Sequence, residues 1–315
     1  MPLELMRRLS LIVALSAAAV CPQAPRAQES TFRASVDVVR IDAFAHRDQQ
    51  PVTGLTARDF VVRDNGVEQQ VDAIGTTDSA HVVVGLDVSA SVDGETLAQL
   101  RAGVAAVLAT LTPRDRVSVF TFADQVRILA RVAQPQAGLD ARIGDLAAAG
   151  STSLHDALVV GSVLARADER PCVFLLFTDG HDTGSWSSTP RVFDILRRTN
   201  VVVFPVGAGL PRDGVPTRES TYFYKWTWTA PAPSDTRLLL ERVADTTGGA
   251  FLRIGRGDRL ADTFARILAS YRQRYLISYT PTGVRTDDGW HRLEVRLRSR
   301  PGAVVAREGY MARQP

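Results

Sequence analysis

Cysteine is scarce in this chain of 315 residues, which has two, Cys21 and Cys172. Cys21 lies in an N-terminal segment that we expect to be removed, so one thiol remains and no internal disulfide can form. Cys172 begins the apolar run CVFLLF, and these neighbours favour an inert, buried thiol over a reactive one. We therefore expect the protein to be held together by its hydrophobic core alone.

Long apolar runs are missing after the N-terminus. The basic head MPLELMRR is followed by LSLIVALSAAAV, an apolar run of 12 residues, which is too short to span a bilayer and typical of a secretory signal. We expect residues 1–27 to be a signal peptide, cleaved after Ala19 or Ala27, and the mature protein to be periplasmic or secreted. A lipid anchor at Cys21 is disfavoured, because Val20 is bulkier than the residue that lipoprotein processing usually accepts.

An excess of charge of one sign is also absent. The whole chain carries a formal charge of +3, and the segment 1–27 contains Arg7, Arg8, Arg26 and Glu4. Its removal leaves 34 basic and 33 acidic residues. This balance gives no support for a nucleic acid or an anionic membrane as the partner.

The usual signatures of several enzyme classes are missing as well. The sequence has no G-x-S-x-G elbow, no Walker loop and no Rossmann glycine fingerprint. A phosphatase with an aspartyl nucleophile would need a carboxylate at the position of Ser89. We therefore predict that the protein is not an enzyme.

The middle of the chain has a clear pattern. Continuous apolar segments (HVVVGLDV, RVSVFTFA, CVFLLFTDG and VVVFPVGAG) alternate with helical patterns at 95–111, 154–167, 190–199, 236–249 and 259–274. Strands that are apolar on both faces, separated by amphipathic helices, predict a doubly wound, mostly parallel α/β sheet with both faces covered. The segment QVRILARV predicts a short antiparallel strand at one edge.

The two flanks of this region alternate like β-strands, over 31–75 and again from 274 to 312. The Asn-Gly pair in RDNGVEQ is a strong hairpin signal. Neither flank is long enough to bury a core easily by itself. We predict that both flanks form one small β-sandwich with the α/β domain inserted between them, and the alternative is that each packs separately. The domain division is then 28–77, 78–273 and 274–315.

Oxygen-bearing side chains gather where the predicted strands end. Asp87, Ser89 and Ser91 follow the first core strand in LDVSAS, Asp179 follows another in LFTDG, and Thr152 opens a helix in GSTSLHDAL. In a doubly wound sheet, ligands bind outside the carboxyl ends of the strands. Two carboxylates and three hydroxyls, without a thiolate, suit a hard cation such as Mg²⁺ and leave a coordination position for an acidic ligand.

These motifs resemble the von Willebrand factor type A domain and its metal-ion-dependent adhesion site. The resemblance covers about residues 80–273, and the flanks are similar to bacterial exported proteins called von Willebrand factor A-related. It implies that the three hydroxyls contact Mg²⁺ or Mn²⁺ and that Asp87 and Asp179 bind the ion directly or through water. It also implies an adhesion-type function, in which an Asp or Glu of a partner protein completes the coordination shell.

Two other functions stay open at this point. One is a structural component of a cell-envelope complex with a stabilising metal, and the other is a metal-dependent hydrolase. His155 and His181 lie close to the expected ligands, but no third nitrogen or sulfur ligand is present, so we expect them on a solvated rim. Asp156 is expected to orient the start of a helix and not to bind the metal.

Aromatic residues near this edge are candidates for partner binding. The run YFYKWTW follows the exit of VVVFPVGAG, and Trp186 lies a few residues beyond Asp179. Tyr and Trp are common anchors of protein interfaces. We expect the anchors to be Trp186, Tyr222, Tyr224, Trp226 and Trp228; the alternative for 222–228 is a hairpin packed on the protein's own surface.

Overall fold

The computed structural model describes residues 38–48, 50–92, 94–135, 138–180, 182–208, 233–254, 259–285 and 289–312. The expected signal peptide, Cys21, His181 and the aromatic residues at 222–228 lie outside the described residues. Within the described ranges, no helix has the length and apolar character needed to cross a bilayer.

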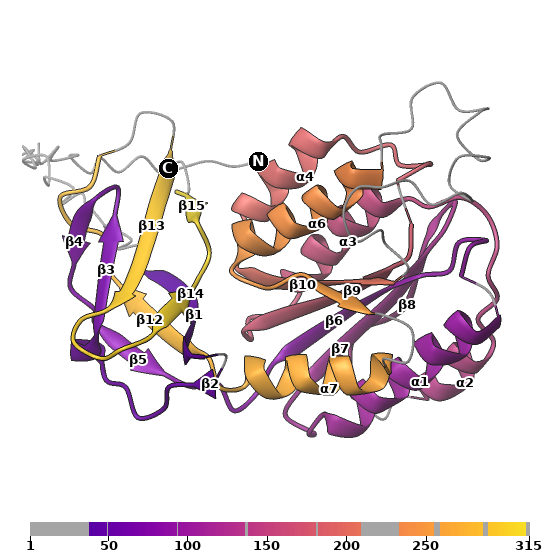
Figure 1. Cartoon of the computed structure of the whole chain (residues 1–315), viewed down its shortest axis with the longest axis horizontal. Helices are drawn as coiled ribbons and strands as arrows, with labels where there is room; N and C mark the ends of the chain where they lie inside the picture. The colour runs from indigo at the N-terminus through magenta and orange to yellow at the C-terminus, as the bar shows by residue number, and fades with distance from the viewer. Residues whose placement is uncertain are drawn as a thin grey trace, which may run out of the picture. The chain divides into compact units, whose positions relative to one another are not determined.

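A six-stranded sheet forms the centre of the α/β part (Figure 1). Its order is β11-β10-β9-β6-β7-β8, and all neighbours are parallel except β7 and β8. Both the mostly parallel sheet and the antiparallel edge strand are therefore confirmed. The strands are β6 (His81–Asp87), β7 (Arg116–Phe122), β8 (Val126–Ala133), β9 (Cys172–Thr178), β10 (Val201–Ala208) and β11 (Leu252–Ile254).

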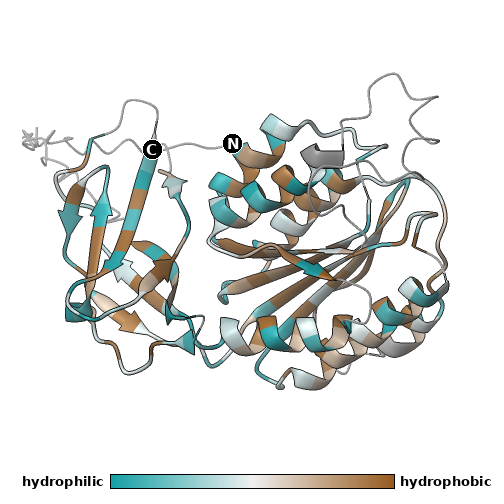
Figure 2. Cartoon of the chain, in the orientation of Figure 1, coloured by the Kyte–Doolittle hydropathy of each residue, from teal (hydrophilic) through white to brown (hydrophobic). Residues whose placement is uncertain are grey.

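Helices cover both faces of this sheet (Figure 1). One face packs against α1 (Gly94–Thr110), α2 (Leu139–Gly144) and α7 (Leu260–Tyr271), and the other against α3 (Leu154–Ala165), α4 (Thr189–Arg197) and α6 (Pro233–Thr247). Successive residues of a strand point to opposite faces, so Val82 and Val84 enter one core cluster and Val83 enters the other. This explains the continuous apolar strands, which are brown in Figure 2. The pattern did not predict α2, because a helix of six residues is too short to show a period.

Cys172 begins β9 and is buried. Burial raises the pKa of its thiol well above the ordinary value, and the charges of Asp42 and Asp168 raise it further. The prediction of a buried cysteine is confirmed.

Strands from the two flanks combine into two antiparallel sheets. The first has the order β14-β1-β12-β5, with β2 also paired to β1, and the second has the order β15-β13-β3-β4. In the first sheet β1 pairs with β12, and in the second β3 pairs with β13, so each sheet contains strands from both flanks. The strands are β1 (Val39–Arg47), β2 (Gln50–Pro51), β3 (Phe60–Asp64), β4 (Val67–Gln69), β5 (Ala73–Gly75), β12 (Tyr275–Tyr279), β13 (Trp290–Leu297), β14 (Ala303–Val305) and β15 (Gly309–Met311), with the 3-10 helix η1 (Ala57–Asp59) before β3.

One core joins these two sheets. Ile41 and Val62 of the N-terminal flank lie in the same buried cluster as Ile277 and Val295 of the C-terminal flank. The prediction of a single sandwich is thus confirmed, and separate packing of the flanks is wrong. The Asn-Gly hairpin is confirmed too: it joins β3 to β4 with positive φ at Asn65 and at the following glycine.

A buried polar cluster reinforces the sandwich. Asp64 of the N-terminal flank is fully buried and accepts hydrogen bonds from the hydroxyls of Tyr279 at 2.7 Å and Tyr310 at 2.8 Å. The Nδ1 atom of His291 lies 2.8 Å from the other carboxylate oxygen. Three of the four side chains come from the C-terminal flank, so the cluster links the two ends of the sequence.

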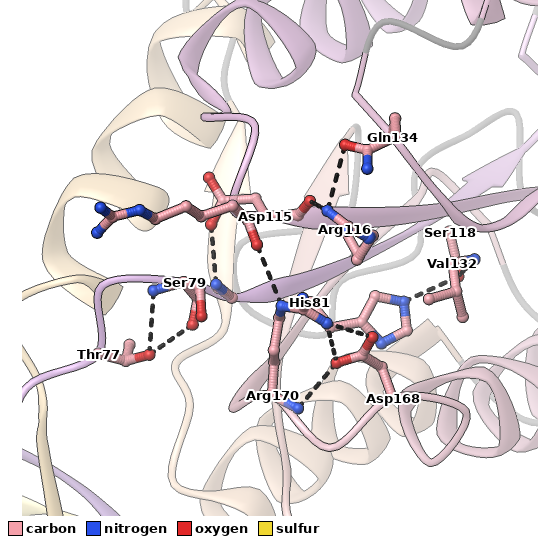
Figure 3. Close-up of polar contacts among 12 residues, drawn as sticks. Thr77, Ser79, His81, Asp115, Arg116, Ser118, Val132, Gln134, Asp168 and Arg170 are labelled. Atoms are coloured by element: carbon pink, nitrogen blue, oxygen red, sulfur yellow. Dashed lines mark hydrogen bonds and ion pairs between the residues drawn. The ribbon is translucent and has the colours of Figure 1, made fainter.

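A second buried carboxylate connects the amino ends of β6 and β7 with the end of α7. Asp115 is fully buried and accepts hydrogen bonds from the backbone N–H groups of Ala80 and Thr112, at 2.8 and 2.7 Å, and from the Thr112 hydroxyl at 2.9 Å. Arg272 donates a further bond at 2.8 Å. Figure 3 draws Asp115 among neighbouring polar residues, including His81 and Arg116. Burial raises the pKa of Asp115, but the hydrogen bonds outweigh it, so the pKa lies below its ordinary value.

Candidate metal-binding site

The site begins at the carboxyl end of β6, where Asp87 is the last strand residue and is fully buried. One carboxylate oxygen of Asp87 accepts a hydrogen bond from the backbone N–H of Ser89 at 3.0 Å. Backbone hydrogen bonds fix the loop that follows: Val88 donates to Phe122 of β7, and Ala90 donates to Gly150. The loop therefore places its polar side chains at a defined point on the sheet edge.

A chain of hydrogen bonds links this loop to the loop after β9. The hydroxyls of Ser89 and Ser91 lie 3.2 Å apart, and the Ser91 hydroxyl donates to Asp179 at 3.0 Å. Thr178, the last residue of β9, donates its hydroxyl hydrogen to Asp87 at 2.7 Å. The two loops meet because β6 and β9 are neighbouring parallel strands whose carboxyl ends share one edge.

Thr152 completes the group from the start of α3. A Cβ atom built at Gly180 would lie 3.7 Å from the Thr152 hydroxyl and 4.0 Å from the Ser91 hydroxyl, so both hydroxyls face the same glycine. The structure therefore brings together all five side chains that the sequence indicated as metal ligands. Thr152 is nearly buried, Asp179 is half-buried and Ser91 is exposed, so one side of the group is open to solvent.

The strand order explains why the site forms here. β6 lies between β7 and β9, so the chain adds its next parallel strand, β7, on one side of β6 and the following one, β9, on the other side. The loops that leave a sheet at such a switch point diverge and open a crevice at the carboxyl edge. Asp87 ends β6 and Asp179 follows β9, so both carboxylates belong to this switch point.

The donor atoms of this group fit a hard divalent cation. Burial raises the pKa of Asp87, and hydrogen bonds from Ser89, Thr178 and the Asp179 backbone oppose this without cancelling it. None of these groups carries a positive charge, so a cation beside Asp87 would balance a charge that its own contacts leave unbalanced. Two carboxylates with three hydroxyls are ligands that Mg²⁺ and Mn²⁺ accept. The described residues contain no group of three His, Cys, Asp or Glu side chains suited to a metal, so the group depends on its hydroxyls.

His155 differs from the prediction of a solvated rim. Its side chain is only 14% exposed, and its Nδ1 atom lies 3.1 Å from Asp182. Burial raises the pKa of Asp182, but hydrogen bonds from His155 and Ser185 hold it below the ordinary value. No pattern in the sequence indicates this pair, because its two residues lie 27 positions apart and on different elements.

Asp156 faces the backbone of the loop after β9. Its two carboxylate oxygens accept hydrogen bonds from the N–H groups of Trp186 and Ser187. Its carboxylate therefore orders this distant loop, whereas the sequence predicts that it orients the start of its own helix. Trp186 itself is 96% exposed. The other aromatic candidates, Tyr222, Tyr224, Trp226 and Trp228, lie outside the described residues.

A search of solved structures matched the chain to proteins from several bacteria. A von Willebrand factor type A protein from Catenulispora acidiphila is 13% identical, with 81% of this chain and 75% of that chain covered and a TM-score of 0.49. The conserved hypothetical protein BatB from Bacteroides thetaiotaomicron is 13% identical over 61% of this chain and 98% of its own, with a TM-score of 0.45. The vWF domain of the type V pili tip protein Mfa5 from Porphyromonas gingivalis is 19% identical over 35% and 40%, with a TM-score of 0.31.

A search of curated proteins gave no match to the chain. The model of the family named von Willebrand factor type A domain matches residues 81–219, a segment that begins at the first residue of β6. This match covers less than half of the chain, and it includes all five side chains of the candidate site. Together with the parallel sheet and the helices on both of its faces, it shows that the α/β part of this chain has the fold of a von Willebrand factor type A domain.

Proposed function

We propose that this chain is an exported binding module, without enzymatic activity, that captures an acidic side chain of a partner protein at a Mg²⁺ or Mn²⁺ site. One observation carries the proposal: five oxygen-bearing side chains from three loops meet at one open edge of the sheet, and only two of them are carboxylates. Two carboxylates balance the charge of a divalent ion and leave it attractive to a third carboxylate. A closed structural site would use more protein charge and would not face solvent.

In this proposal each side chain has a defined role. Ser89, Ser91 and Thr152 place their hydroxyl oxygens on the ion, while Asp87 and Asp179 bind it directly or through water. The hydrogen bonds to Asp87 from Thr178 and Ser89 hold its carboxylate in one orientation. The bound ion supplies one strong and directional contact to the incoming carboxylate.

Calorimetric titration with Mg²⁺ and Mn²⁺ tests the site. Asp87→Asn should abolish binding, and Thr152→Ala should weaken it. Asp194→Ala is a suitable control, because Asp194 is a partly exposed acid on α4 that pairs with Arg198. Wild-type affinity in Asp87→Asn would show that the ion is not bound here.

A second experiment separates the partner-binding function from a stabilising metal. The immobilised protein is incubated with cell-envelope extract in Mg²⁺ or in EDTA, and Asp87→Asn is treated in the same way. The proposal requires a partner that is retained by the wild type in Mg²⁺ and lost both in EDTA and from the variant. Partners that are retained equally in all conditions would indicate that the metal only stabilises the fold.

A further inference from the structure

Trp186 has the most exposed large apolar side chain among the described residues. It is 96% exposed, whereas Leu238 at 60% and Val163 at 56% come next. One exposed apolar residue is common on protein surfaces and by itself indicates nothing. What distinguishes Trp186 is that its backbone is held firmly in place next to the candidate metal site.

The carboxylate of Asp156 accepts hydrogen bonds from the backbone at Trp186 and at the next residue. One oxygen accepts the Trp186 N–H at 3.0 Å, and the other accepts the Ser187 N–H at 2.9 Å. Asp156 lies in the first turn of α3, whose own hydrogen bonds fix its position. The backbone of Trp186 therefore has little freedom, although its side chain lies in water.

The residues before Trp186 are tied to Thr152 itself. The Thr152 carbonyl accepts the N–H groups of Thr183 at 2.8 Å and Gly184 at 3.1 Å, and the Thr152 N–H donates to the Thr183 hydroxyl at 2.9 Å. A Cβ atom at Gly184 would lie 2.6 Å from the Ser151 hydroxyl, so this loop is pressed against the segment that carries Thr152. Thr152 contributes one of the five site oxygens, so the loop keeps a fixed position relative to the site.

A second set of hydrogen bonds joins the beginning of the same loop to α3. Asp182 accepts the backbone N–H of His155 at 3.1 Å and pairs with the His155 ring at 3.1 Å. The Ser185 hydroxyl donates to Asp182 and accepts the N–H of Asp156 at 3.1 Å. The loop 182–187 is therefore hydrogen-bonded along its length to Thr152 and to the first turn of α3.

We propose that Trp186 is a fixed aromatic anchor that binds an apolar side chain of the same partner segment whose carboxylate reaches the metal. This inference rests on the proposed function, and it defines the partner as a protein segment with an Asp or Glu and an apolar or aromatic residue a few positions away. An ion supplies one directional contact but little contact area, so a specific complex needs an apolar contact nearby. A Trp on an ordered backbone supplies a large area and loses little conformational entropy on binding, because only two side-chain torsions remain to be fixed.

The test uses a displayed library of random peptides with one fixed central Asp. The library is selected on the immobilised full chain in Mg²⁺ and eluted first with EDTA and then with acid, which recovers any peptide that resists EDTA. We expect the eluted peptides to share an apolar or aromatic residue at a constant spacing from the Asp. The same selection on Trp186→Ala should give peptides without a shared apolar position.

One selected peptide is then synthesised and titrated against a set of variants. Trp186→Ala should weaken its binding at least about tenfold, as expected for an interface anchor, while Trp186→Phe should keep most of the affinity. Val163→Ala, at an exposed apolar position of α3, should bind like the wild type. Asp156→Asn keeps one acceptor oxygen and removes the other, so it should weaken peptide binding less than Trp186→Ala does. The Mg²⁺ affinity should be unchanged in all four variants.

The outcomes separate this inference from the proposed function. Mg²⁺-dependent peptides with equal affinity for the wild type and Trp186→Ala would overturn the anchor and leave the metal function intact. Peptides that depend on Trp186 but resist EDTA would overturn the metal function and support the anchor. If the wild type selects no peptide, both are overturned.

Discussion

Mg²⁺ should determine which protein is more stable, the wild type or the variant Asp87→Asn. Asp87 is fully buried, and it accepts hydrogen bonds from the Thr178 hydroxyl, from the N–H and hydroxyl of Ser89, and from the Asp179 backbone. Asn has nearly the same shape: its amide oxygen can accept the Ser89 N–H, and its amide nitrogen can donate to the Thr178 hydroxyl oxygen. The substitution weakens some of these hydrogen bonds but removes a buried charge that no cationic side chain balances, so without metal we expect the variant to be as stable as the wild type or more stable.

With Mg²⁺ the order should change. A ligand present at 100 times its dissociation constant stabilises the folded state by about 2.7 kcal/mol. For a domain of this size, 1 kcal/mol shifts the melting temperature by roughly 2–4 °C, so the wild type should gain about 5–10 °C. Asp87→Asn should gain nothing, because it cannot balance the charge of the ion.

Differential scanning calorimetry of both proteins, in Mg²⁺ and in EDTA, measures the two differences directly. Asp194→Ala is the control and should show the same shift as the wild type. An equal shift in Asp87→Asn, or no shift in the wild type, would refute the assignment of Asp87 to a metal site. A strongly destabilised variant in EDTA would show that the carboxylate is needed for the fold itself.

Three further predictions concern the fold. Asp115→Asn should lower the free energy of unfolding at pH 7 by about 2–4 kcal/mol, since it removes the charge that Arg272 and three other hydrogen bonds favour. Because the folded pKa lies below the ordinary value of 3.8, this contribution is present above that pH and is lost in more acidic solution, so urea titrations should show the difference between the two proteins closing below about pH 4. Gly161→Ala should lower the free energy of unfolding by about 1–3 kcal/mol, because its Cβ atom would lie 2.2 Å from the buried ring of Phe174. Gly144→Ala is the control and should leave it unchanged, because no atom lies within 4 Å of that Cβ position. Thermal melts that rank the two variants equally would contradict this packing. Deleting 274–315 should leave β1 and β3 without their partners β12 and β13, so their amides should exchange rapidly and the protein should aggregate. The segment 78–273 should fold alone. Slow exchange in β1 of the truncated protein would speak against a joint sandwich.

The sequence by itself was sufficient for features that depend on local pattern. Apolar residues along His81–Asp87 and Cys172–Thr178 predicted strands buried on both faces, since only a sheet covered by helices on both sides buries every residue of a strand. The Asn-Gly turn predicted a hairpin because two successive positive φ angles suit few other residue pairs. The motifs at the strand ends and at the start of one helix, together with their resemblance to the von Willebrand factor type A domain, indicated the five candidate ligands, whose role as ligands stays a prediction.

Only the tertiary structure decided which distant segments meet. The pairing of β1 with β12, the Asp64 cluster and the bond between Asp156 and the Trp186 backbone join residues far apart in the chain. No periodicity encodes such contacts, because they depend on the order of strands and on the core that two sheets or two layers share. The pair between His155 and Asp182 is of this kind, and the sequence placed that histidine on a solvated rim. The local sequence pattern determines which helix or strand forms and which of its faces is buried. Which elements become neighbours is determined by the requirement that all these apolar faces are buried together.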